Sequence, residues 1–95
     1  MKTKASEGFK KLFAAAQKSP HYHAQKHQIE IAEAIYNYKQ QHNLTVKEIA
    51  YKLGVSRGYM HEILKANANL TILSMVKLAM ALDMDLSIEM KEKEV

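Results

Sequence analysis

The feature that most constrains the fold is the stretch of residues 44–65, LTVKEIAYKLGVSRGYMHEILK, which holds two short helical patterns on either side of a glycine. Thr45 and Glu48 have the Thr-x-x-Glu spacing of a capping box, which satisfies two backbone N–H groups where a helix begins. Gly54 tolerates the positive φ that ends such a helix, and Ser56 is suited to cap the next one. The stretch therefore predicts two helices that meet at a sharp turn.

The apolar residues of this stretch are spaced to bury one face of each helix. They are Ile49, Ala50, Leu53, Val55, Met60, Ile63 and Leu64. Because the second helix, from Arg57 to about Lys65, turns Met60 and Ile63 inward, its remaining residues must face solvent or a partner. The small Ala50 suits the close approach of the two helices.

Composition limits what else the chain can do. Its 95 residues, 47% hydrophobic with three Gly and one Pro, fit one small helical domain. The absence of cysteine excludes a disulfide framework and a thiolate zinc site. No run approaches the roughly 20 apolar residues of a membrane helix, and the apolar residues 13–16 are too few for a secretion signal. We therefore expect no membrane association and a cytoplasmic location.

Two further helices flank the central stretch. Ser19 and Pro20 are typical of a helix start, and the apolar pattern continues to His42, before Asn43, which is suited to a left-handed stop. Thr71 is suited to cap a last helix over residues 72–82. That helix is apolar nearly all round, which predicts that it lies deep in the core or is shared between the core and a subunit interface.

Residues 1–18 carry five Lys and one Glu, with Phe9, Leu12, Phe13 and Ala16 at the spacing of an amphipathic helix that Ser6 is suited to begin. A helix this short is marginal alone, so its apolar stripe must pack on something. Its own domain, a partner subunit and another protein all remain open.

Leu86, Ile88 and Met90 alternate with polar residues, which is the period of a half-buried strand. A strand needs a second strand, and nothing else in the chain predicts one. A symmetry mate is the simplest supplier, which predicts a homodimer; a different protein is the alternative. The expected fold is thus all-α with about five helices and a short C-terminal β-strand: an N-terminal helix (1–18), a helix-turn-helix domain (19–84), and a strand with an acidic tail (85–95).

The central stretch resembles the helix-turn-helix of the Cro/lambda-repressor type, the XRE-like family. That family carries Ala, then Gly four residues later, then an apolar residue and Ser, with apolar residues along the second helix. Here these slots hold Ala50, Gly54, Val55, Ser56, Met60 and Ile63, and residues 69–71 and 76–82 are similar to the family's next loop and helix. About residues 28–84 are covered. One departure is Val46, where the family often has a Gln that grips phosphate.

The resemblance implies a DNA-binding transcriptional regulator whose second helix enters the major groove. The outward residues of that helix are then the base-reading candidates: Arg57, Gly58, His61 and Glu62. Arg57 is favoured, since a guanidinium can donate two bonds to one guanine. Residues at helix ends and in the following loop are candidates for phosphate contacts: Thr45, Lys47, Ser56, Tyr59, Lys65, Asn67 and Asn69. For Glu62, a solvent-facing charge or a partner for Arg57 is an equally good interpretation, and the role of His61 is open in the same way.

Charge agrees with a polyanionic partner. Before Asp83 the chain has 12 basic and 5 acidic residues, and from Asp83 onward 2 basic and 5 acidic. A basic body favours double-stranded DNA through counterion release, although such charge is also typical of an ordinary solubilising surface. A basic helix added to an XRE-like domain further resembles HigA-type antitoxins, which repress their own operon and bind a toxin.

Other functions are less favoured by the residues. His23 and His27 have a metal-compatible spacing beside His21, but solvated histidines are the preferred interpretation, and no metal or other cofactor is expected. No nucleophile with a base, carboxylate pair or phosphate loop predicts catalysis. The main hypothesis is a dimeric repressor of a palindromic operator, and the competing one is a protein-interaction module that does not read DNA.

Overall fold

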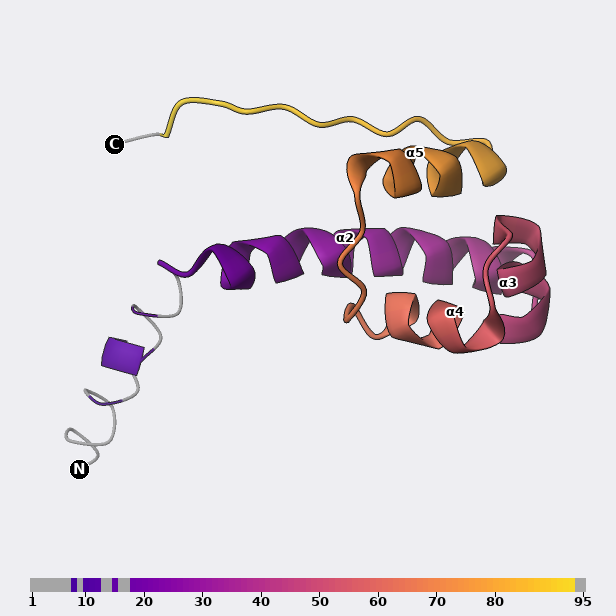
Figure 1. Cartoon of the computed structure of the whole chain (residues 1–95), viewed down its shortest axis with the longest axis horizontal. Helices are drawn as coiled ribbons and strands as arrows, with labels where there is room; N and C mark the ends of the chain where they lie inside the picture. The colour runs from indigo at the N-terminus through magenta and orange to yellow at the C-terminus, as the bar shows by residue number, and fades with distance from the viewer. Residues whose placement is uncertain (1–7, 9, 13–14, 16–17, 94–95) are drawn as a thin grey trace.

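The computed structural model describes residues 8, 10–12, 15 and 18–93. All regular secondary structure within them is α-helix. Helix α2 (Pro20–Gln41) is the long axis of the molecule, and the short helices α3 (Val46–Leu53), α4 (Arg57–Leu64) and α5 (Ile72–Ala81) gather around its second half (Figure 1). The predicted all-α class is confirmed. No helix in this part of the chain combines the length and apolar character needed to cross a membrane.

The N-terminal helix predicted over residues 1–18 falls mostly outside the described residues, which leaves out Ser6, Phe9, Phe13 and Ala16. Of its predicted apolar stripe only Leu12 is described. That residue is helical, with 73% of its surface exposed.

The four helices α2 to α5 begin where the cap residues predicted. Ser19, Thr45, Ser56 and Thr71 each accept a hydrogen bond from a backbone N–H of the first turn of their helix. At Thr45 the capping box is complete: the N–H of Glu48 donates to Thr45 Oγ1 (3.1 Å) and the N–H of Thr45 donates to Glu48 Oε1 (2.8 Å). Each start is thus set within a few residues of sequence.

The same helices end in one common motif. One or two positions after each helix, a residue takes a left-handed φ: Asn43 (54°), Gly54 (72°), Ala66 (62°) and Asp83 (57°). In each case the N–H of the next residue bonds back across the last turn, as from Leu44 to the carbonyl of Lys39 (2.9 Å). The sequence predicted the stops at Asn43 and Gly54. It did not predict those at Ala66 and Asp83, where the left-handed residue is neither Gly nor Asn.

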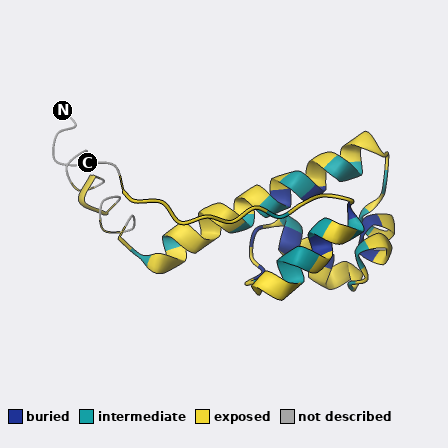
Figure 2. Cartoon of the chain, turned by 90° about the horizontal axis from the view of Figure 1, so that it is seen from above, coloured by how far each residue is buried: buried dark blue, intermediate teal, exposed yellow. Residues whose placement is uncertain are grey.

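The core lies where the short helices meet the second half of α2. Ile35, Ile49, Met60 and Ile63 are at most 2% exposed, and Leu78 brings α5 into the same cluster. Helix α4 packs against both α2 and α3, and α3 packs against α5. Figure 2 shows the buried residues confined to this end of the molecule, while the first half of α2 is almost entirely exposed.

Helix α5 does not lie deep in the core. Only Leu78 of this helix is buried, and Ile72, Leu73 and Met80 are 63%, 64% and 72% exposed. The reason is that the helix is covered on one side alone, by α2 and α3. The first of the two predictions for this helix is wrong, and the second, a share in a subunit interface, stays a prediction.

The predicted C-terminal strand is absent from the described residues. Residues 86–90 are extended but belong to no sheet, because the described chain offers no second strand for them to pair with. Of the predicted dimer contacts, Leu86 is half-buried, whereas Ile88 and Met90 are exposed. The segment runs back past α5 and along the exposed half of α2 (Figure 1).

Candidate nucleic-acid interface

The turn between α3 and α4 is held by local bonds and by one close contact. Ala50 is only 3% exposed where the helices meet, and its carbonyl accepts the N–H of Val55 (3.0 Å) across the turn at Gly54. Ser56 Oγ then accepts the N–H of Tyr59 (3.0 Å), which starts α4. The orientation of α4 is therefore fixed by the residues that the sequence singled out.

The outward face of α4 carries all four predicted base-reading residues. Met60 and Ile63 are at most 2% exposed, so the opposite side of the helix is turned to solvent. That side presents Arg57, Gly58, His61, Glu62 and Lys65, all exposed. Tyr59 lies on the flank between this face and the core, 41% exposed. Arg57, His61 and Lys65 follow one another at four-residue spacing, which makes a basic stripe along the helix.

Two members of this face differ in how they are held. The carboxylate of Glu62 lies 3.9 Å from Nζ of Lys65, so its partner is Lys65 and not Arg57. The guanidinium of Arg57 makes no hydrogen bond or ion pair with any described residue. Its five donors are therefore available to a ligand.

Gly58 is not required by the packing of the protein. A Cβ placed on it would meet no atom within 4 Å, and its φ is not positive. A glycine inside a helix costs about 0.5–1 kcal/mol relative to alanine, so the fold alone gives no reason for it. Because Gly58 has no side chain, another molecule can approach the backbone of α4 closely at this point of the exposed face.

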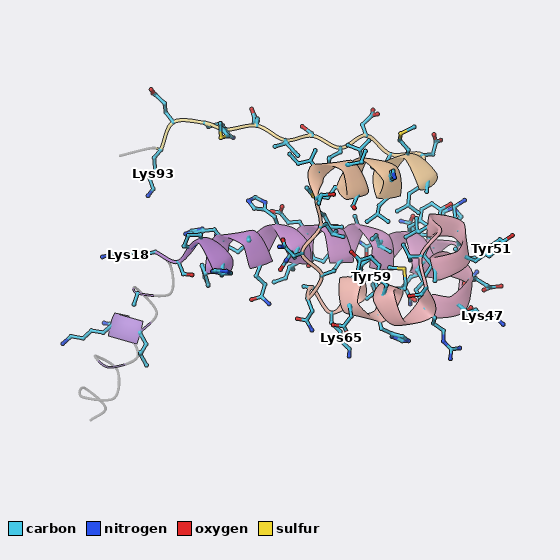
Figure 3. The ribbon with its side chains drawn as sticks, in the orientation of Figure 1. Lys18, Lys47, Tyr51, Tyr59, Lys65 and Lys93 are labelled. Carbon is cyan, nitrogen blue, oxygen red and sulfur yellow. The ribbon has the colours of Figure 1, made fainter. Side chains whose placement is uncertain are left out.

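The predicted phosphate contacts surround α4. Lys47 lies in the first turn of α3, and Lys65 lies just after α4, beside the loop that carries Asn67 and Asn69 (Figure 3). All seven predicted residues are exposed, although the hydroxyls of Thr45 and Ser56 already serve as caps. Val46 differs from them, because its half-buried side chain packs on the core.

Two residues near this surface were missed by sequence reasoning. Tyr51 is 88% exposed on α3, one turn after Lys47, and the spacing alone could have found it. Gln28 on α2 donates from Nε2 to the carbonyl of Ala68 (2.9 Å), which ties the loop bearing Asn67 and Asn69 to the long helix. Its partner is 40 residues away, so no local pattern could have indicated it.

The histidines of α2 are not grouped in threes with further ligand side chains among the described residues. Nδ1 of His27 lies 3.1 Å from Oε1 of Glu30, and both side chains are more than 70% exposed. Across residues 18–93, no three His, Cys, Asp or Glu side chains are grouped to hold a metal ion.

Comparison with known proteins found no family model, no curated protein and no solved structure that matches this chain. The functional argument therefore rests on the residues and geometry of the chain itself.

Proposed function

We propose that this chain is a sequence-specific DNA-binding transcriptional regulator, and that α3 and α4 form a helix-turn-helix of the Cro/lambda-repressor type. The observation that carries the proposal is the outward face of α4. The unpaired guanidinium of Arg57, the imidazole of His61 and the exposed Gly58 lie on this face. The helix itself is held in place by its N-cap, Ser56, and by the buried side chains of Met60 and Ile63. Rigid support of a short polar face is what base recognition requires.

The dimensions and chemistry of this face suit the major groove. A groove about 12 Å wide admits one α-helix, and Gly58 allows the backbone of α4 to come close to the base edges. Arg57 can donate two bonds to O6 and N7 of one guanine. Glu62 can accept from the N4 amino group of cytosine, since its exposed pair with Lys65 is worth only about 0–1 kcal/mol.

Phosphate contacts on either side of α4 would set its register on the duplex. Lys47 and Lys65 bracket the helix, and Asn67 and Asn69 extend the line into the loop that Gln28 holds. In Figure 3, Lys18 and Lys93 lie at the other end of the molecule, away from this surface. Basic residues outside α3, α4 and the loop after α4 would therefore add to general attraction and not to register.

The biological role that fits this chemistry is repression of a palindromic operator by a dimer, with two α4 helices one helical turn apart. Autoregulation of a toxin-antitoxin operon, with a toxin as protein partner, is the special case that the basic N-terminal segment suggests.

The test is selection of bound duplexes from a random pool at moderate salt. We expect one palindromic sequence to be enriched, and enrichment of no sequence would contradict the proposal. The Gly58→Ala variant sharpens the test, because a Cβ meets no obstacle in the free protein. The variant should be at least as stable as the parent but bind the selected duplex more weakly.

A protein-interaction module is the second candidate, and the exposed apolar residues of α5 are the observation that favours it. This candidate predicts no sequence enrichment in the pool. It also predicts that Arg57→Ala leaves every interaction of the chain unchanged, whereas changes at Leu73 or Met80 remove one.

A further inference from the structure

The segment after α5 leaves both backbone and apolar groups open. In the described part of the chain, no N–H or C=O of residues 85–93 takes part in a backbone hydrogen bond. Leu86 is half-buried, and Ile88 and Met90 are 57% and 97% exposed. An extended segment with open backbone groups and an alternating apolar face is a template for a second strand.

We propose that this segment pairs antiparallel with the same segment of a second copy of the chain, with Ile88 on the two-fold axis. The resulting two-stranded ribbon has one apolar face, formed by Leu86, Ile88 and Met90 of both copies. The pairing deepens the proposed function, since it supplies the dimer that a palindromic operator needs. It rests on the residues of the segment alone, and its test requires no DNA.

The register follows from symmetry and charge. In a symmetric antiparallel pair, each residue faces the one equally far beyond the axis. With Ile88 on the axis, Leu86 faces the partner's Met90, so apolar residues meet apolar residues. On the other face of the ribbon Asp85 lies opposite the partner's Lys91, and symmetry repeats this pair of opposite charges.

The neighbouring registers also bring apolar residues together, but each adds an unfavourable pair. Moving the axis to Ser87 places Asp85 opposite the partner's Glu89, which sets like charges directly across the ladder. Moving it to Glu89 places Glu89 opposite its own mate and Leu86 opposite the partner's Glu92. Of the three registers, only the one centred on Ile88 pairs Leu86, Ile88 and Met90 among themselves without setting like charges opposite each other.

The fold also offers a place for the outermost apolar residue. Leu86 lines an apolar groove of about 100 Å³ between α2 and α5, together with Ile31, Ala34, Leu78 and Leu82. Because Met90 faces the partner's Leu86, its side chain reaches the open side of this groove in the other copy. A residue that is 97% exposed in the single chain thereby becomes covered.

Disulfide trapping tests the register directly, because the chain has no cysteine of its own. Ile88→Cys places two thiols across the axis, within the range a disulfide spans, and should form covalent dimers at least about tenfold faster than Tyr51→Cys, an exposed control on α3. Leu86→Cys should behave like the control, since the two copies of residue 86 lie four residues apart along the ladder. Equal rates for Ile88→Cys and Tyr51→Cys would overturn the proposal, as would faster trapping at residue 86.

A charge swap gives an independent readout by sedimentation equilibrium. Asp85→Lys alone should raise the dimer dissociation constant by about tenfold, because both cross-strand pairs become like-charged. Adding Lys91→Asp should return it to within about threefold of the parent value. The pairing would be refuted if the parent chain stays monomeric at about 100 µM, or if the double variant has the same dimer dissociation constant as the single one. Neither result would bear on DNA binding by α4.

Discussion

The corner formed by α3 and α4 and the segment after α5 both carry regularly spaced apolar residues, but they differ in where their backbone polar groups find partners. In the corner, the backbone groups at the helix ends bond to caps and carbonyls at most five residues away, and Ile49 and Met60 are 0% exposed. After Met84, the described segment makes no backbone bond at all. The backbone groups at the helix ends of this corner find partners within the chain, whereas those of the segment find none among the described residues.

This difference separates two roles. A surface that must present side chains to a ligand needs rigid support, which the corner supplies to α4. A surface that joins two copies through strand pairing needs unsatisfied backbone groups, and we propose this role for the C-terminal segment. Under the two proposals, recognition falls to the most closed region of the chain and assembly to the most open one.

The largest contrast is expected between two methionines. Met60→Ala should lower the free energy of unfolding by about 2–5 kcal/mol, because it removes a fully buried side chain of the core. Met90→Ala, at a position 97% exposed, should change it by less than about 0.5 kcal/mol at concentrations where the chain is monomeric. Urea denaturation of both variants measures the difference, and equal losses would contradict the division into a closed and an open region.

A smaller contrast is expected between two helix caps. Thr45→Ala removes the capping box that positions α3, and it should cost about 1 kcal/mol in urea unfolding. Ser19→Ala removes a cap at the exposed end of α2, which can fray without disturbing the core, so its cost should be only a few tenths of a kcal/mol. A larger loss for Ser19→Ala would mean that the first half of α2 is supported by contacts absent from the described fold.

The smallest contrast concerns the two left-handed stops that lack Gly or Asn. Asp83→Gly should stabilise the fold by about 0.5–1 kcal/mol, which raises the melting temperature. Asp83 is exposed, so the substitution removes only the backbone strain of its left-handed φ. Ala66→Gly relieves the same strain but gives up a buried methyl group worth about 0.8 kcal/mol, so its effect should be near zero. Thermal unfolding distinguishes the two, and a clear gain for Ala66→Gly would show that its methyl group contributes little to packing.

How far the sequence could predict this molecule depended on the range of the interactions involved. The starts of α2 to α5 were predictable because Ser19, Thr45, Ser56 and Thr71 act within their own first turn. The stop at Ala66 was not, because an alanine adopts a left-handed φ only when the surrounding core holds it there.

The candidate site follows the same rule. The outward residues of α4 could be read from periodicity once Met60 and Ile63 were recognised as core. The bond from Gln28 to Ala68 could not, since it joins positions 40 residues apart. The strand over residues 86–90 was predicted from a real alternation, but a strand exists only when a second one pairs with it, and the described residues contain none.

The central claim is that α4 reads base edges while the residues around it hold phosphates, and one measurement separates these roles. It is the ratio of affinities for the selected duplex and for a scrambled duplex of the same length, at several salt concentrations. For Arg57→Ala we predict that this ratio falls by about 5- to 150-fold, which corresponds to the 1–3 kcal/mol of one bidentate base contact.

The matched control is Lys47→Ala, at an exposed position in the first turn of α3. Loss of one phosphate contact should weaken binding to both duplexes equally and reduce the salt slope by about one. If Arg57→Ala instead lowers both affinities in parallel and leaves their ratio unchanged, then α4 does not read sequence and the account is contradicted.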